Sequence, residues 1–229
     1  MGLPLNHGFH RILFYGVLSL QLIMFIAIEG IDGSGKSTLA SSIEKVLSSL
    51  NYRVYRTYEP TDKFLENQVI LEKSGRDEPL LLLSLFLKDR IEHSNEIKRQ
   101  LDMGNIVICD RYSLSTFAYQ GALLRNNFED DKSWIEWMEN VLSIVRLIPD
   151  LTIYLDLDPK EFMQRKVGNH QYEMFENEEY LRSVYDTYRK AIDHKILSKS
   201  YHICDASLPR NMVLECAMNG IKSNINLLK

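Results

Sequence analysis

The residues best suited to chemistry stand together in one short segment, Gly30–Ser37, which reads Gly-Ile-Asp-Gly-Ser-Gly-Lys-Ser. A glycine, four residues and then Gly-Lys-Ser is the spacing of a P-loop, in which glycines let backbone N–H groups turn inward around phosphate oxygens. Lys36 can reach the β- and γ-phosphates of a nucleoside triphosphate, so the spacing predicts phosphoryl transfer. The residues predicted to hold the nucleotide are Gly30, Ile31, Asp32, Gly33, Ser34, Gly35, Lys36, Ser37 and Thr38.

Two oxygen-bearing side chains could bind a metal beside this loop. Ser37 offers a hydroxyl, and Asp110 directly follows the apolar run 105–109, which predicts a buried strand. P-loop enzymes bind Mg²⁺ through the loop hydroxyl and a carboxylate at the tip of a buried strand. We therefore expect Ser37 and Asp110 to hold Mg²⁺, with ATP as co-substrate. The alternative interpretation of Asp110 is a simple cap of the strand end.

Short apolar runs alternate with helical patterns along the chain, which is typical of a parallel α/β sheet. Strands are predicted at 25–29, 53–57, 105–109, 151–156 and 201–204. Helices are predicted at 36–50, 79–101, 113–124, 133–147, 159–166, 178–196 and 209–225. The sequence therefore predicts an α/β fold with a five-stranded parallel sheet and helices on both faces. Ligands in such sheets bind beyond the carboxyl ends of the strands.

The composition restricts the class of protein. Of the 229 residues, 45% are hydrophobic and 25% are charged, as in an ordinary globular protein. A formal net charge of −4 does not favour nucleic acid as a partner. The three cysteines, Cys109, Cys204 and Cys216, are too few and too scattered for a disulfide framework or a zinc site. We expect them to be buried thiols in a reducing compartment.

The run Ile12–Ile28 is almost wholly apolar. A membrane span needs about 20 such residues, and the end of this run is required for the strand before the P-loop. No small-residue cleavage site of a signal peptide follows it. We therefore expect no membrane segment. Residues 1–23 are interpreted as an extension that is non-native or disordered, and residues 24–229 as a single domain beginning at Met24.

Several separated motifs, in the right order, resemble those of the thymidylate kinase family, and the resemblance covers the chain from Met24 onward. The motifs are 25–30 leading into the P-loop, 59–60, 85–90, 110–112, 115–116, 118–121 and 149–156. The resemblance implies a three-layer P-loop kinase fold with a short lid at about 166–176. It also implies transfer of the γ-phosphate of ATP to dTMP.

The resemblance assigns roles to individual residues. Arg111 would bind the acceptor phosphate, Phe86 would stack on thymine, and Arg90 would hydrogen-bond to the base. Phe86 and Arg90 are four residues apart, so they share a helix face, and stacking on an aromatic ring contributes about 1–3 kcal/mol. The implied substrate-binding set is Asp32, Glu59, Phe86, Arg90, Arg111, Thr116, Tyr119 and Gln120. The implied catalytic set is Lys36, Arg111, Asp32 and Arg165, of which Arg165 matches a lid residue that packs against adenine.

The lid and the P-loop depart from the family's pattern. Gly33 stands in a part of the loop where family members often carry a basic residue, and Gln171 stands where an arginine of the lid would be. Lys166 and His170 are the nearest substitutes, and His170 also fits a plain exposed residue. Loss of such a charge would slow phosphoryl transfer strongly.

The loop after the second strand departs as well. Tyr58 occupies the place where an arginine commonly precedes Glu-Pro. Arg56 and Lys63 are then the candidate phosphate ligands.

Three functions are compatible with these residues. The first is a dTMP kinase acting in dTTP synthesis, which needs no general base because a monophosphate is mostly dianionic at pH 7. The second is a related kinase acting on dUMP or on a deoxynucleoside, whose hydroxyl would need a base such as Glu59. The third is a nucleotide-binding protein with weak or lost catalysis. The resemblance further implies a cytoplasmic homodimer, formed through the apolar faces of helices 80–97 and 113–124.

Overall fold

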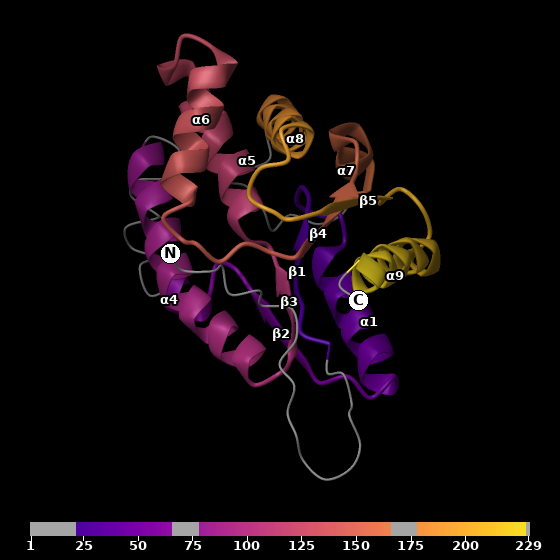
Figure 1. The fold of residues 1–229 in the computed structure, drawn as a ribbon. Coiled ribbons are helices and arrows are strands. Elements are labelled where there is room, and N and C mark those ends of the chain that lie inside the picture. Colours follow the sequence, from indigo (N-terminus) through magenta and orange to yellow (C-terminus); the bar gives the residue numbers. More distant parts are fainter. Residues whose placement is uncertain (1–21, 66–77, 166–177, 228–229) are drawn as a thin grey trace.

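A computed structural model describes residues 22–65, 78–165 and 178–227 of the chain. Five parallel strands form one sheet in the order β2-β3-β1-β4-β5 (Figure 1). The strands are β1 (Phe25–Glu29), β2 (Val54–Tyr58), β3 (Ile106–Asp110), β4 (Leu151–Asp156) and β5 (Tyr201–Asp205). The predicted α/β class and the five-stranded parallel sheet are confirmed.

Helices cover both faces of the sheet, so the predicted three-layer arrangement is also confirmed. On one face, α1 and α9 pack on the strands and on each other, and on the other face lie α4, α5 and α8 (Figure 1). The helices are α1 (Lys36–Ser49), α2 (Asp62–Leu65), α4 (Pro79–Asp102), α5 (Ser113–Leu124), α6 (Asp131–Leu142), α7 (Pro159–Arg165), α8 (Glu178–Asp193) and α9 (Arg210–Leu227), with a 3₁₀ turn η1 (Arg125–Asn127). The predicted lid and residues 1–21 lie outside the described residues.

Two predicted helices have wrong ends. The helix predicted at 178–196 ends three residues earlier, at Asp193. The helix predicted at 133–147 begins at Asp131, because the side chain of Asp130 accepts a hydrogen bond from the Ser133 backbone at 2.7 Å. It ends at Leu142, after which the chain turns so that Val145 is buried and Leu147 packs against a second apolar cluster. The short elements α2 and η1 were not predicted.

The register of the central strands brings the chemistry to one edge. In the pairing of β1 with β3, Ile28 lies beside Asp110, and in the pairing with β4, Glu29 lies beside Tyr154. The four residues from Phe25 to Ile28 are buried, which explains their purely apolar composition. The carboxyl ends of these strands therefore surround the P-loop, as expected for a parallel sheet.

The cysteine prediction is wrong for two of the three residues. Cys204 of β5 and Cys216 of α9 form a disulfide, while Cys109 is a buried free thiol as predicted. The two cysteines are distant enough in sequence that only the packing of α9 on β5 brings them together. Within the ranges that the structure describes, no helix is long and apolar enough to cross a membrane.

Candidate active site

The P-loop connects β1 to α1 through three positions whose backbone conformation favours glycine. Gly30, Gly33 and Gly35 have φ angles of 146°, 71° and 95°, where a side chain would be strained. Lys36 is buried, and its Nζ donates to the Ile31 carbonyl oxygen at 2.7 Å. Burial, with the nearby positive charge of Arg111, lowers the pKa of Lys36 from 10.5 to about 7. Anionic phosphates beside Lys36 would favour its charged form.

A cavity of about 400 Å³ opens beside the P-loop, a volume typical of small-molecule sites. Its far wall is the segment that follows β5, and Leu39 of α1 adds an apolar surface. From that segment the lining residues are Ala206, Leu208, Pro209, Arg210 and Val213. The sequence interpretation missed these residues, although the rule that ligands bind beyond the strand ends points to them.

Ser37 and Asp110, which the sequence predicts to hold Mg²⁺, lie within hydrogen-bond distance of each other. The Ser37 hydroxyl donates to Oδ2 of Asp110. The other oxygen of Asp110, Oδ1, is buried and has no hydrogen-bond partner among the described residues. A hydroxyl and a buried, unsatisfied carboxylate oxygen are hard ligands of the kind that Mg²⁺ prefers. The two residues therefore fit a magnesium ion.

Gly33 faces the ring of Phe162 on α7. A Cβ built on Gly33 would lie 2.5 Å from two ring carbons, closer than any real contact. Within this arrangement a basic side chain at position 33 would displace either the loop or Phe162. Packing thus explains the glycine that departs from the family's pattern.

Arg111 is fixed beside the P-loop by Asp32 and Tyr119. Its Nη2 donates to Asp32 Oδ1, and its guanidinium carbon lies 5.3 Å from the centre of the Tyr119 ring. The Tyr119 hydroxyl accepts a hydrogen bond from the backbone N–H of Asp32 at 3.0 Å and donates one to Oδ2 of Asp32 at 2.9 Å. Burial opposes ionisation of Asp32, but Arg111 and Lys36 outweigh it and lower the pKa of Asp32. The sequence-predicted trio of Asp32, Lys36 and Arg111 is therefore one electrostatic unit.

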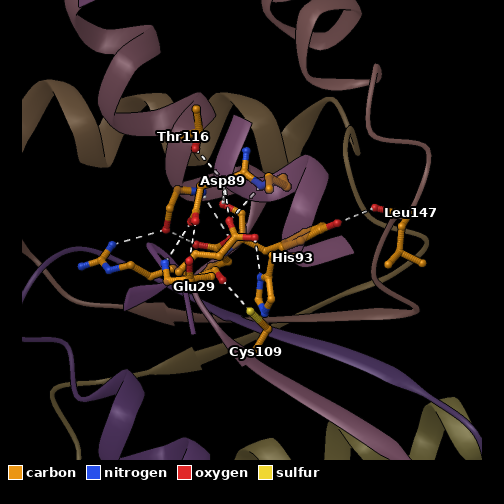
Figure 2. Close-up of polar contacts among 12 residues, drawn as sticks. Glu29, Asp89, His93, Cys109, Thr116 and Leu147 are labelled. Carbon is orange, nitrogen blue, oxygen red and sulfur yellow. Dashed lines mark hydrogen bonds and ion pairs between the residues drawn. The ribbon is translucent and has the colours of Figure 1, made fainter. Parts of the chain in front are cut away.

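Glu29, which the sequence interpretation did not single out, secures the turn that carries Arg111. This fully buried carboxylate accepts hydrogen bonds from the Tyr112 backbone at 2.8 Å, from the Ser115 hydroxyl at 2.5 Å and from the Tyr188 hydroxyl at 3.3 Å (Figure 2). Burial raises the pKa of Glu29 to about 7 against the effect of these bonds. Arg111 has a φ of 69°, rare for a residue with a side chain. Such strain persists only where neighbours hold it, as Glu29 does here.

Arg90 lies in a second buried network. Its Nε and Nη2 donate to Oε2 of Glu59 at 2.8 and 2.6 Å, and Nη2 also donates to the Thr116 hydroxyl at 2.8 Å. Both side chains of the ion pair are buried, with exposed fractions of 1% for Arg90 and 3% for Glu59. The remaining group of Arg90, Nη1, has no partner among the described residues. The two N–H donors of Nη1 are therefore left for a ligand.

His93 completes this network and was missed by the sequence interpretation. Its Nδ1 lies 2.9 Å from Oε1 of Glu59 (Figure 2). Its Nε2 lies 2.7 Å from the Thr57 hydroxyl. Because a carboxylate can only accept, Nδ1 carries a proton, and Nε2 pairs with the Thr57 hydroxyl. His93 is three residues after Arg90 on α4, a spacing that shares a helix face and could have revealed it.

The remaining predicted residues are placed as follows. Phe86 stacks on Phe64 of α2, with ring centres 4.6 Å apart, so Phe64 covers one of its two faces. Gln120 is buried on α5. Arg165 ends α7, and its side chain lies outside the described residues, as do Lys166, His170 and Gln171.

Neither candidate for the missing phosphate ligand after β2 faces this site. Arg56 points from β2 toward α1, where its Nε lies 2.7 Å from a carboxylate oxygen of Glu44. It alternates with Thr57, which points toward α4. Lys63 is exposed and lies 3.8 Å from Glu92 of α4.

Comparison with known proteins identifies the family. The sequence pattern of the family described as Thymidylate kinase matches residues 28–216. A probable thymidylate kinase of Thermoplasma acidophilum is 44% identical over 168 residues, which cover 72% of this chain and 82% of that protein. One from Picrophilus torridus is 37% identical over 203 residues, covering 86% and 95%. Probable thymidylate kinase 1 of Saccharolobus solfataricus is 37% identical over 204 residues, covering 87% and 97%. The chain therefore belongs to the thymidylate kinase family.

Proposed function

We propose that the protein transfers the γ-phosphate of ATP to dTMP and so forms dTDP. The observation that carries the acceptor assignment is the unpartnered Nη1 of Arg90 inside an otherwise satisfied network. A donor held in one orientation favours a base that offers a carbonyl oxygen, as thymine and uracil do, and disfavours the amino group of cytosine. Phe86, four residues earlier on α4, is suited to stack on such a base.

The chemistry needs positioning and positive charge more than covalent help. The dianionic acceptor phosphate is already a nucleophile, so the obstacle is bringing two anions together. Lys36 and Arg111 provide cations on the donor and acceptor sides, and Asp32 keeps Arg111 in place. Ser37 and Asp110 are proposed to hold Mg²⁺, which when bound would neutralise charge on the donor phosphates.

A deoxynucleoside acceptor fits this site less well. Such a kinase must deprotonate a hydroxyl, and Glu59 was the residue available for that task. Both of its carboxylate oxygens are occupied, Oε2 by Arg90 and Oε1 by His93. Glu59 is therefore proposed to orient Arg90 rather than to act as a base.

The test is a substrate panel with the purified full chain, ATP and Mg²⁺. We expect the highest kcat/KM with dTMP, lower values with dUMP and dCMP, and no turnover of thymidine. An Arg90→Leu variant should raise the KM for dTMP and reduce the preference for dTMP over dCMP. Equal turnover of dTMP and dCMP by the wild-type protein would reject the assignment.

We also propose that the protein forms a homodimer through α4 alone, and not through both of the helices that the sequence suggested. Residues 113–121 of α5 are buried within the chain itself, so α5 offers no apolar face there for a second copy. On α4, Leu80 and Ile91 are 58% and 46% exposed and lie three helical turns apart on one side. Light scattering of the wild type and of Leu80→Glu tests this, because a dimer through α4 should dissociate in the variant. A cytoplasmic location remains a prediction.

A further inference from the structure

The disulfide joins the two ends of the segment that forms one wall of the cavity beside the P-loop. Cys204 is the fourth residue of β5, and Cys216 lies on α9, twelve residues later. The segment between them supplies Ala206, Leu208, Pro209, Arg210 and Val213 to the cavity wall. A covalent link between the two ends of a segment restricts the conformations that the segment can adopt. The disulfide therefore restrains the segment that forms this wall of the cavity.

An imidazole stands beside the disulfide. His202 and Cys204 are two residues apart on β5, so they share a face of the strand, and Nε2 of His202 lies 3.5 Å from Sγ of Cys216. Gly220, one helical turn after Cys216 on α9, makes room for the ring. A Cβ at Gly220 would lie 2.5 Å from the His202 ring. The packing of α9 on β5 therefore sets the imidazole against the sulfur.

The two cysteines differ in exposure. Cys204 is fully buried, whereas Cys216 is partly exposed. A partly exposed thiol beside a histidine has the surroundings of a reactive thiol, and a buried neighbour is suited to resolve its mixed disulfide. The third cysteine, Cys109, is an internal contrast, because burial raises the pKa of its thiol well above the ordinary value.

We propose that Cys204 and Cys216 form a thiol–disulfide exchange site whose reaction partner is a small-molecule disulfide, and that its redox state tunes ATP binding. Nε2 of His202 takes the proton of Cys216, and the thiolate attacks one sulfur of the small disulfide, whose S–S bond breaks and releases one thiolate. The Cys204 thiol then gives its proton to the released thiolate, and its sulfur attacks Sγ of Cys216 and expels the second thiolate, which takes the proton held by His202. Two electrons pass from the cysteines to the small disulfide, and the two released thiolates take up the protons.

The experiment compares the full-length protein treated with a phosphine reductant and with glutathione disulfide. Alkylation and intact mass should show three free thiols after reduction and one after oxidation, with no retained glutathione. Binding of a fluorescent ATP analogue, which needs no acceptor, should weaken about fivefold or more on reduction, within the usual range of coupling between sites. Because ATP binding is measured without an acceptor, the result does not depend on whether dTMP is the acceptor.

Single variants test the role of each residue in the exchange reaction. Cys216→Ser should abolish both the loss of thiols and the change in ATP binding, while Cys109→Ser should preserve them. His202→Ala should slow the reaction of the reduced protein with glutathione disulfide and leave its end point unchanged. Three free thiols under both conditions, or equal ATP binding in the two redox states, would overturn the proposal. A rate unaltered by His202→Ala would overturn the role of the imidazole.

Discussion

The donor side of the active site presents the backbone of one continuous segment, whereas the acceptor side is assembled from side chains of β2, α4 and α5. Around the P-loop, three glycines with positive φ leave N–H groups and Lys36 to contact a ligand. Around Arg90, a buried ion pair, a histidine and two hydroxyls hold one another. The difference predicts that changes on the donor side alter turnover with little change in stability, while changes on the acceptor side alter both.

The largest effect is expected on the donor side. Lys36→Ala should lower kcat by about 10³-fold or more, because it removes a cation aimed at the transferred phosphate. The free energy of unfolding should not fall, since Lys36 is buried in a setting that lowers its pKa to about 7 and so disfavours its charge. Steady-state kinetics and urea unfolding measure the two quantities. The matched control is Lys45→Ala, an exposed lysine of the same helix. If Lys36→Ala lost turnover only because it unfolds, the proposed difference between the donor side and the acceptor side would be wrong.

The next effect is expected at the buried ion pair. Glu59→Ala should lower the free energy of unfolding by about 3–5 kcal/mol, because it leaves the guanidinium of Arg90 buried without a counter-ion. It should also raise the KM for dTMP. Glu44→Ala removes the exposed pair with Arg56, of the same chemistry, and should change stability by about 1 kcal/mol or less. Equal losses in the two variants would show that burial does not matter here.

The third prediction concerns the dependence of stability on pH. The pKa of Glu29 is about 7 in the folded protein, against an ordinary value of 4.5. The folded state therefore holds this proton more tightly, and the resulting stability is complete below pH 4.5 and is lost as the pH rises through 7. Urea unfolding at several pH values should show the stability of the wild type relative to Glu29→Gln falling by about 3 kcal/mol over this window. A difference that is constant with pH would contradict the prediction.

The smallest effect is expected from a single methyl group in the P-loop. Gly33→Ala should raise the KM for ATP, because the new Cβ would meet Phe162 and the positive φ disfavours a side chain by about 1–2 kcal/mol. Gly35→Ala also places a side chain at a positive φ, 95°, but no atom of the described residues lies within 4 Å of the new Cβ. Phe162→Ala combined with Gly33→Ala should recover the part that is due to contact. No recovery would assign the whole effect to the backbone.

Contiguous features were predictable from the sequence. The P-loop, its strand and its helix follow from glycine spacing and apolar runs, and Asp110 could be assigned because it ends a buried strand. Arg90 and Phe86 came from the family resemblance, and their shared helix face supported the pair. Local rules sufficed here because the groups that act together are neighbours along the chain or along one helix.

Other features depended on distant contacts. Glu29 reads as the last residue of an apolar strand, and only α5 and α8 reveal what its carboxylate binds. His93 reads as one polar residue of a long helix until Thr57 and Glu59 are placed beside it. The end of α6 at Leu142 was missed because the chain turns there and buries Val145 while leaving Ile144 exposed, an outcome that the helical pattern does not contain.

The sequence alone determined the fold class and the donor loop, because both follow from local spacing, and the acceptor motifs could be assigned from it only through the resemblance to the family. The tertiary structure decided that the Phe162 ring packs against Gly33 and that Arg56 forms an ion pair with Glu44 of α1 instead of pointing toward the acceptor site. It also decided that Cys204 and Cys216 form a disulfide. Each of these is a contact between elements far apart in the chain. Such contacts depend on how the helices pack on the sheet, which spacing within one segment does not encode.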